Sequence, residues 1–448
     1  MSANNPHLQL KASSTGSTRS ELRSFGERKV MWISSRATTR RGALSERDGE
    51  RIAHAASTAA SISIPIVCEL STSGAKIQDG VAALHGWGVA ARALAHCSGR
   101  VPILLGLTGP AVSGPALLLG LADYVIMAPD SFAFLSGPQS VMEFTGVSVT
   151  NQDLGGAPVL LNRSGVAFDV ANDRRDIEES ILHFLGYLPD STDQLPTRVD
   201  SIEPVTLELD DLIPDQPTAA YDVRDLVRGI VDADSFYELR ATWANQLVIG
   251  LARLDGRTIG IVANQPKIMA GTLDIPAAQK GARFVRFCDS FNIPILTLVD
   301  TPGFLPGKDV EWRGMIRHGA ELAFSYAACN VPRICLITRK AYGGAYIVMD
   351  SKGIGNDITY AWPSAEIAVM GAQGAVEIIY RRAPAEERLR HQQKYEDEYL
   401  TPWIAAERGY VDNVIDPNQT RKHLMHAFDL LATKQERLRN AKHANSPL

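Results

Sequence analysis

Two glycine-containing loops in this sequence could carry out chemistry through their backbone groups. The run Lys340-Ala341-Tyr342-Gly343-Gly344-Ala345-Tyr346 follows a strand-like segment and precedes a helical pattern. Small residues at such a junction let a ligand approach the backbone, and the first N–H groups of a helix have no intrahelical acceptor. Such N–H groups can stabilise a developing oxyanion by about 3 kcal/mol each. Tight packing of the helix against a sheet would need the same glycines, so the spacing alone leaves both interpretations open.

A second loop, Ala111-Val112-Ser113-Gly114-Pro115, has the same character. Pro115 has no N–H group, so this loop offers fewer backbone donors than the first. Either Ser113 and Gly114 supply the donors that are needed, or this oxyanion site is weakened. Two donor loops predict an enzyme that stabilises two oxyanions, as the transfer of an acyl or carboxyl group between two carbonyl-type partners requires.

The usual signatures of side-chain catalysis are missing from the sequence. It contains no G-x-S-x-G elbow, no H-E-x-x-H motif, no G-x-G-x-x-G fingerprint and no Walker A lysine. The cysteines have no C-x-x-C spacing and mostly adjoin apolar runs, so we predict buried thiols and no metal site. Backbone donors that act on a carrier cofactor fit this sequence better than a side-chain nucleophile does.

Composition and charge exclude several other classes of protein. Apolar residues make up 45% and charged residues 21% of the 448 residues, which is typical of a globular protein with two or three domains. The net charge of −5 gives no basic footprint for nucleic acid. Prolines and glycines interrupt the longest apolar segment, 101–121, so no membrane span is expected. Because the sequence starts without an apolar leader, we expect a cytoplasmic protein.

The chain contains an internal repeat with a nearly constant offset of about 230 residues. Five landmarks recur in the same order: Ile64-Pro65-Ile66-Val67 with Ile293-Pro294-Ile295-Leu296, Thr72-Ser73-Gly74 with Thr301-Pro302-Gly303, Val101-Pro102 with Val331-Pro332, Ser113-Gly114 with Gly343-Gly344, and Pro129 with Pro363. The sequence therefore predicts two copies of one domain, with the two donor loops at equivalent positions.

Each copy has the pattern of a parallel βαβ unit. In the second copy, an apolar strand over 295–300 leads into a glycine loop, a helix over 314–328 and a second strand over 333–337. Continuous apolar strands that alternate with helices predict an α/β fold with both sheet faces covered. Right-handed crossovers then bring the strand-to-helix loops to one edge of the sheet, where ligands bind.

We predict four segments along the chain: a flexible start over 1–29, a first domain over 30–188, a linker over 189–220 and a second domain over 221–448. The first segment is rich in Ser, Thr and Arg and lacks a sustained apolar pattern, which favours a disordered start. The linker contains five prolines and many acidic residues, as solvated connections often do.

Long motifs add to these patterns, mostly between residues 263 and 382 and again in the tail. They are Ala263-Asn264-Gln265-Pro266, Ala282-Arg283-Phe284-Val285-Arg286, Val299-Asp300-Thr301-Pro302-Gly303-Phe304-Leu305-Pro306-Gly307, Arg339-Lys340-Ala341-Tyr342-Gly343-Gly344-Ala345-Tyr346, Ala361-Trp362-Pro363, Val369-Met370-Gly371-Ala372-Gln373-Gly374-Ala375-Val376 and Ala406-Glu407-Arg408-Gly409-Tyr410-Val411-Asp412. With these motifs the sequence resembles the carboxyltransferase (β) subunits of biotin-dependent acyl-CoA carboxylases, such as the propionyl-CoA and acetyl-CoA carboxylase β chains.

The resemblance implies a fold and a set of partners. The fold would be two tandem crotonase-like (ClpP/crotonase) domains, in agreement with the internal duplication. The first domain would hold the acyl-CoA, and the second would hold carboxybiotin, which a separate carrier protein presents. The partner would be a biotin carboxylase/biotin carrier α subunit. The active site would lie at a dimer interface within a hexamer of β subunits.

The resemblance also implies roles for individual residues. Gly344 and Ala345, in the loop with Gly343, would donate to the ureido oxygen of biotin and favour loss of the carboxyl group. Ser113 and Gly114 would face the enolate of the thioester. Five residues would bind substrate: Gly74, Ala75, Gly303, Tyr346 and Ile347. Ile347 would line the acyl pocket as in members that prefer acetyl-CoA, and ordinary packing is the alternative for this residue.

The first half departs from the family pattern. The family's G-G-A-R loop reads Ser73-Gly74-Ala75-Lys76 here, its G-G-A loop reads Ser113-Gly114-Pro115, and Arg-rich sequence around Arg36, Arg40 and Arg41 replaces part of the start. We therefore expect either an unusual acyl substrate or a subunit that needs a standard β partner. Two alternatives to carboxylation stay open: a decarboxylase of a malonyl-type CoA thioester, and a non-catalytic β-like subunit that completes a mixed acyl-CoA carboxylase complex.

Overall fold

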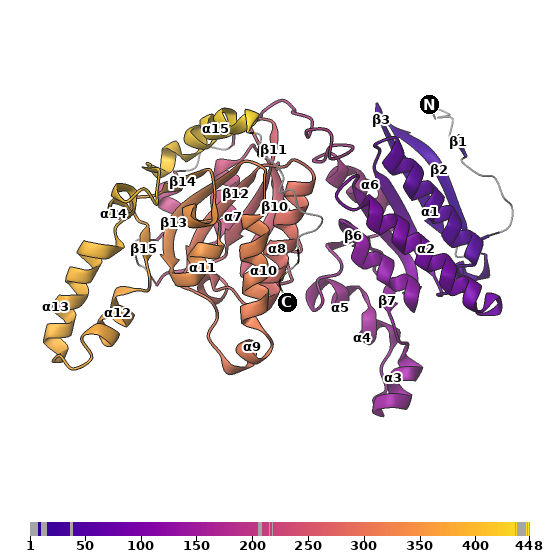
Figure 1. Cartoon of the computed structure of the whole chain (residues 1–448), viewed down its shortest axis with the longest axis horizontal. Helices are drawn as coiled ribbons and strands as arrows, with labels where there is room; N and C mark the ends of the chain where they lie inside the picture. The colour runs from indigo at the N-terminus through magenta and orange to yellow at the C-terminus, as the bar shows by residue number, and fades with distance from the viewer. Residues whose placement is uncertain are drawn as a thin grey trace. The chain divides into compact units, whose positions relative to one another are not determined.

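The chain forms two compact units in the computed structural model, Met1–Pro196 and Thr197–Leu448 (Figure 1). The structure describes residues 8–9, 16–35, 39–204, 208–214, 216, 218–434, 436, 445 and 447. Each unit is an α/β domain built on one eight-stranded sheet. Among the described residues, none of the helices combines the length and the apolar character that a membrane crossing needs.

The sheet of the first unit has the strand order β1-β2-β3-β4-β5-β6-β8, and β7 pairs with β5 off this path. Its strands are β1 (Leu8–Gln9), β2 (Thr18–Phe25), β3 (Arg28–Ser35), β4 (Ile66–Thr72), β5 (Ile103–Val112), β6 (Tyr124–Met127), β7 (Phe132–Phe134) and β8 (Asp169–Val170). The first three strands pair antiparallel, and every pairing from β3 onwards is parallel. Parallel pairing brings the carboxyl ends of β4 and β5 to the same edge of the sheet.

The sheet of the second unit repeats this arrangement in the order β16-β14-β13-β12-β11-β10-β9, with β15 paired to β13. Its strands are β9 (Tyr237–Leu239), β10 (Leu247–Leu254), β11 (Arg257–Asn264), β12 (Ile295–Thr301), β13 (Arg333–Tyr342), β14 (Ile358–Ala361), β15 (Glu366–Ala368) and β16 (Asn413–Val414). The strands that the sequence predicts over 295–300 and 333–337 are therefore β12 and the first half of β13.

The strand register shows the duplication in detail. In the first unit, Ile66 pairs with Ile103, and the register slips before Thr72 pairs with Ala111. In the second unit, β12 and β13 slip at the equivalent place, just before Thr301. A shared irregularity of this kind is a conserved feature of a fold and not a local defect. The predicted duplication of one α/β domain is thereby confirmed.

Helices cover the sheet of the first unit. They are α1 (Glu46–Ser61), α2 (Val81–Cys97), η3 (Gly114–Leu121), α3 (Pro138–Thr145), α4 (Asn151–Gly155), α5 (Ala157–Asn162) and α6 (Arg174–Leu185). α1 begins with a capping box between Ser45 and Asp48. α1 and α2 pack backbone to backbone, since a Cβ on Gly49 would lie 1.9 Å from the carbonyl oxygen of Gly86. This close contact fixes the distance between α1 and α2.

The helices of the second unit are α7 (Val223–Ile230), α8 (Ile275–Ser290), α9 (Lys308–Trp312), α10 (Met315–Ala327), α11 (Gly343–Val348), α12 (Ala372–Ile379), α13 (Ala385–Tyr395), α14 (Pro402–Glu407) and α15 (Thr420–Leu430). The helix predicted over 314–328 is α10, within one residue at each end. α8 begins at the N-cap Asp274, whose side chain accepts a hydrogen bond from the Ala277 N–H.

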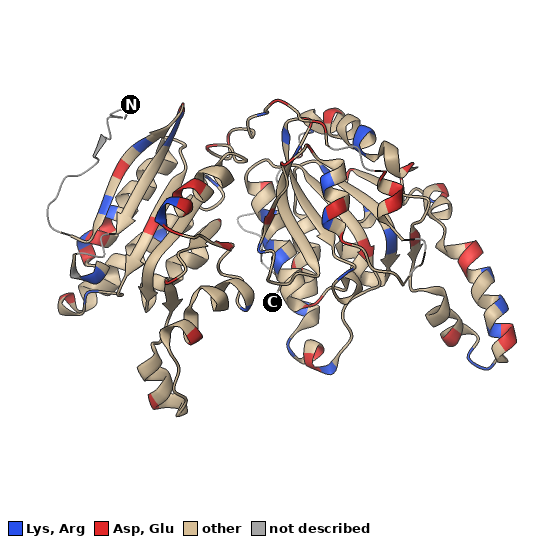
Figure 2. Ribbon diagram, turned by 180° about the vertical axis from the view of Figure 1, so that it is seen from behind, with Lys and Arg blue, Asp and Glu red and all other residues tan. Residues whose placement is uncertain are grey.

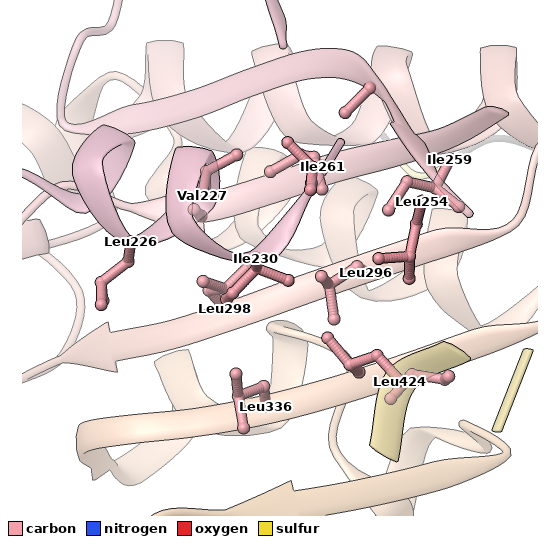
Figure 3. Packing of buried hydrophobic residues seen from close by; sticks show 14 of the residues in the cluster. Leu226, Val227, Ile230, Leu254, Ile259, Ile261, Leu296, Leu298, Leu336 and Leu424 are labelled. Atoms are coloured by element: carbon pink, nitrogen blue, oxygen red, sulfur yellow. The ribbon is translucent and has the colours of Figure 1, made fainter. Parts of the chain in front are cut away.

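A large apolar core holds the second sheet in place. α7 contributes Leu226, Val227 and Ile230, and α15 contributes Leu424, to one face of the strands (Figure 3). These side chains pack against buried aliphatic side chains of the strands: Ile259, Ile261, Leu296, Leu298 and Leu336. Full burial of one such side chain stabilises a fold by about 1.5–3 kcal/mol. The strands β12 and β13, whose carboxyl ends carry the predicted donor loop, are therefore held in a large buried core.

The structure differs from the predicted flexible start over 1–29. Residues 18–25 form β2, which pairs with β3 along its whole length. The Thr18 N–H donates to Asp48 Oδ1 at 2.9 Å, and the Arg51 guanidinium donates to the Thr18 carbonyl. Polar side chains and the hydrogen bonds of the sheet stabilise this strand. Its composition therefore shows no apolar pattern from which a strand could be predicted. Residues 1–7 and 10–15, and Arg36, lie outside the described residues.

The predicted linker over 189–220 is also divided differently. The boundary between the units falls after Pro196. Beyond it, the Val199 N–H donates to the Gly256 carbonyl at 3.0 Å, and Leu209 is buried in the core of the second unit. Most of this acidic stretch therefore packs on the second unit, with Leu209 as a buried apolar contact. The many prolines and acidic residues around Leu209 lead to the prediction of a solvated linker.

Candidate active site

The loop after β13 presents the start of α11. Gly343 has a φ of +60°, a conformation that favours glycine. Gly344 is exposed, and a Cβ there would meet only the Phe304 ring, at an ordinary contact distance of 3.6 Å. Packing within this unit thus does not require glycine at position 344. The role predicted for this glycine, access of a ligand to the first N–H groups of α11, stays a prediction.

A buried ion pair holds this loop from below. Asp300, at the end of β12, accepts from Arg339 Nε at 3.0 Å and from the Lys340 N–H at 3.1 Å. Arg339 also donates to the Ala219 carbonyl at 2.8 Å and lies over the Tyr221 ring. Burial, and then the Asp300 charge, hold the pKa of Tyr221 well above its ordinary value. These contacts connect β12, β13 and the segment 219–221 next to the donor loop.

The equivalent loop of the first unit has fewer backbone donors. Ser113 takes the place of Gly343 and has a φ of +63° and a ψ of −152°. Its N–H donates to the Phe134 carbonyl at 2.9 Å, and the Ala116 N–H donates to the Ser113 carbonyl at 2.9 Å. Pro115 has no N–H. The predicted pair of backbone donors therefore reduces to Gly114, because the Ser113 N–H already has an acceptor.

Trp87, which the sequence did not single out, lies against this loop. A Cβ on Gly114 would lie 2.6–2.9 Å from the Trp87 ring, so glycine is required here for packing. The indole Nε1 of Trp87 is buried, and no acceptor for it lies among the residues that the structure describes. The neighbouring glycines give no signal of this contact, because Gly86 packs against α1 and a Cβ on Gly88 would meet nothing within 4 Å.

The loops after β4 and β12 are built alike. The Gly74 N–H donates to Thr72 Oγ1 at 3.1 Å, and the Gly303 N–H donates to Thr301 Oγ1 at 3.4 Å. In the first unit this loop meets the donor loop, because a Cβ on Gly74 would lie 3.5 Å from Ser113 Cβ. The structure thus brings Gly74 together with Ser113. Ala75, the neighbour of Gly74, forms a parallel bridge with Leu44.

Two predicted substrate-binding residues of α11 have different surroundings. Ile347 is 45% exposed, so its side chain is available to a ligand or a partner. Tyr346 is 8% exposed, and burial raises the pKa of its hydroxyl. Tyr346 therefore packs mainly within the unit. A direct contact between Tyr346 and substrate stays a prediction.

The structure offers no thiol or metal chemistry among the residues that it describes. All five cysteines are free and buried, and burial raises the pKa of Cys68 to about 12. A thiol with such a pKa is not a thiolate at neutral pH and is a poor nucleophile. Within the described ranges, no group of three or more His, Cys, Asp or Glu side chains could hold a metal ion.

Comparisons with known proteins identify the family of this chain. A family model described as the carboxyl transferase domain matches residues 24–446. The chain belongs to the carboxyl transferase family. The propionyl-CoA carboxylase carboxyltransferase subunit of Haloferax mediterranei is 44% identical over 417 residues, which cover 91% of this chain and 81% of that subunit. The methylmalonyl-CoA decarboxylase subunit alpha of Veillonella parvula is 42% identical, with 92% and 81% covered.

A solved structure also matches most of the chain. The transcarboxylase 12S hexamer, with methylmalonyl-coenzyme A and methylmalonic acid bound, superposes with a TM-score of 0.94 at 39% identity. The match covers 96% of this chain and 85% of that one. The predicted tandem crotonase-like fold and the predicted carboxyltransferase β-subunit family are therefore confirmed, as is the prediction of a biotin-dependent carboxyltransferase enzyme.

Proposed function

We propose that this chain moves a carboxyl group from carboxybiotin, on a separate carrier protein, to the α-carbon of an acyl-CoA. In this proposal the second unit serves the biotin side and the first unit serves the acyl-CoA side. The observation that carries it is the pair of equivalent loops at the carboxyl ends of β5 and β13, each with a helix start. One reaction with two negatively charged intermediates needs two such sites.

On the biotin side, the N–H groups of Gly344, which is exposed, and of Ala345, whose side chain is buried, serve as the donors. When bound, carboxybiotin supplies CO₂ from its ureido nitrogen, and negative charge is left on the ureido oxygen. The open position above Gly344 fits a flat ring, because a Cβ there would meet only Phe304. Gly343, which precedes both donors, adopts the φ of +60° that the turn into α11 requires. Donors fixed before reaction stabilise the charge without reorganisation.

On the acyl side, the Gly114 N–H donates to the thioester oxygen. It would stabilise the charge that forms there when the α-proton passes to the ureido nitrogen that has released CO₂, so that the α-carbon can take up that CO₂. Gly74 and Ala75 form the neighbouring wall, since Gly74 lies beside Ser113. In this proposal Ile347, whose side chain is 45% exposed, lines the acyl pocket of another subunit at a dimer interface.

The chain works as an oligomer in this proposal, together with a biotin carboxylase/biotin carrier α subunit. α3 in the first unit and α12 and α13 in the second extend away from their sheets (Figure 1). These arms carry exposed apolar side chains, among them Phe144 (93% exposed), Met142, Ile378, Ile379 and Leu389. Residues of both charge signs lie along α13 (Figure 2). Apolar patches of this kind mark protein interfaces, and the related transcarboxylase 12S is a hexamer.

A decarboxylase is the second candidate, because a relative at 42% identity carries that name. Decarboxylation of a malonyl-type CoA thioester leaves the same enolate, so the Gly114 loop would serve both reactions. A non-catalytic β-like subunit in a mixed carboxylase complex is the third candidate. The single backbone donor of the first unit motivates it.

Fixation of labelled bicarbonate tests these candidates. The full chain is combined with a biotin carboxylase and a biotinylated carrier and is assayed with acetyl-CoA and propionyl-CoA. Acid-stable label in the acyl-CoA product is the expected result. Release of label from carboxylated thioester without any fixation would favour the decarboxylase. Fixation only after addition of a second β chain would favour the accessory subunit, and no label in any arrangement would refute carboxyl transfer.

A further inference from the structure

We propose that the hydroxyl of Ser113 is the second oxyanion donor of the first unit and replaces the backbone N–H that Pro115 lacks. This inference rests on the proposed function and assigns a catalytic residue to its acyl side. The atom at issue is the side-chain Oγ of Ser113 and not its N–H, which donates to the Phe134 carbonyl at 2.9 Å.

The number of donors gives the first reason. The first turn of α11, which begins at Gly343, contains Gly344 and Ala345, and both residues have an N–H group. At the equivalent turn of η3, Pro115 has no N–H, and the Ala116 N–H donates to the Ser113 carbonyl. Gly114 alone is left, and oxyanion sites ordinarily use two donors.

The backbone of Ser113 gives the second reason. Its φ of +63° and ψ of −152° lie in a region that is essentially restricted to glycine. Gly343, at the equivalent position, also has a positive φ, of +60°. A serine there is strained where glycine is not. Strained non-glycine residues persist mainly where the side chain has a function.

The surroundings of the side chain give the third reason. Ser113 is exposed, it caps η3 without a side-chain hydrogen bond, and its hydroxyl has no partner among the described residues. Its Cβ lies 3.5 Å from the position of a Cβ on Gly74, in the loop after β4. The hydroxyl is therefore free to donate between the two loops that the acyl thioester would contact.

The test compares three variants of the full chain in the labelled-bicarbonate assay with acetyl-CoA and propionyl-CoA. Ser113→Ala removes the hydroxyl and is expected to lower kcat about 100-fold. KM for the acyl-CoA is expected to stay within about twofold, because the donor acts on the transition state. Ser98→Ala, which removes an exposed serine hydroxyl at the end of α2, is the matched control and is expected to behave as wild type.

The double variant Ser113→Ala/Pro115→Ala decides the mechanism. It restores an N–H at the second position of η3. Its kcat is expected to be at least about tenfold higher than that of Ser113→Ala. Wild-type kcat in Ser113→Ala would overturn the proposal. A loss that Pro115→Ala leaves unchanged, or that comes with a lower melting temperature, would overturn it too, since the hydroxyl would then be structural. If wild type itself fixes no label, the proposed function fails, and this assignment fails with it.

Discussion

The donor loops of the two units share a topology but differ in what holds them. In the second unit a buried Asp300–Arg339 pair supports a loop of small residues with an open Gly344. In the first unit Ser71 takes the place of Asp300 and Gly109 that of Arg339, and the Trp87 ring fills the space above Gly114. One fold thus supports a rigid ionic site and a site assembled from packing and a strained serine. The contrast shows that the topology of the fold determines where the loop lies. The neighbouring residues determine which backbone N–H groups of the loop are free to bind a ligand.

The largest expected effect concerns Gly344. Gly344→Val should lower carboxyl transfer at least about 1,000-fold, because the side chain blocks access to two N–H donors. The fold should be retained, since a Cβ at this position meets only Phe304 at 3.6 Å. Carboxyl transfer and the melting temperature are measured together.

The matched change in the first unit is Gly114→Ala. It should lower the stability by about 1–3 kcal/mol, because its Cβ would lie 2.6 Å from the Trp87 ring. Gly344→Ala should leave the melting temperature nearly unchanged. Equal melting temperatures for both alanine variants would contradict the distinction between a ligand glycine and a packing glycine.

The buried ion pair gives the next effect. Arg339→Met leaves the Asp300 carboxylate buried without its partner, which costs about 3–5 kcal/mol of stability. Ser71→Ala, at the equivalent place in the first unit, should cost about 1 kcal/mol at most. Thermal unfolding followed by circular dichroism measures both. A small loss in Arg339→Met would mean that the pair does not support the loop.

Ser113→Gly should raise stability. Glycine adopts a φ of +63° and a ψ of −152° without the strain that serine has there, which is worth about 1–3 kcal/mol. The melting temperature of the first unit should therefore rise while carboxyl transfer falls. A lower melting temperature would show that the serine side chain stabilises the loop instead of straining it.

Alkylation of the thiols should have the smallest effect. All five cysteines are buried, and burial raises the pKa of Cys68 to about 12. Iodoacetamide at pH 8 should therefore neither modify the folded chain nor lower its activity. Mass spectrometry counts the adducts. Rapid loss of activity together with a single adduct would reveal a reactive thiol and contradict backbone-donor chemistry.

The sequence predicts the structure best where a pattern of residue types decides it. The repeat of Ile64-Pro65 as Ile293-Pro294, and the glycine pair 343–344, indicated the duplication and the second donor loop. Contacts between distant segments could not be read in this way. The acceptor of the Ser113 N–H is Phe134, 21 residues further on, and Trp87 approaches Gly114 from another helix. β2 was missed because polar residues and hydrogen bonds stabilise it, not an apolar face.

The central claim is that the two loops act on two different partners. It is tested by following label on a carboxylated biotin carrier, with and without acyl-CoA, in the presence of wild type, Gly344→Val or Ser113→Ala. We predict that Gly344→Val slows both the release of label from the carrier without acyl-CoA and its transfer to acyl-CoA. Ser113→Ala should slow the transfer about 100-fold and leave the release at the wild-type rate. Slower release with Ser113→Ala, or unchanged release with Gly344→Val, would contradict this division of work between the two units.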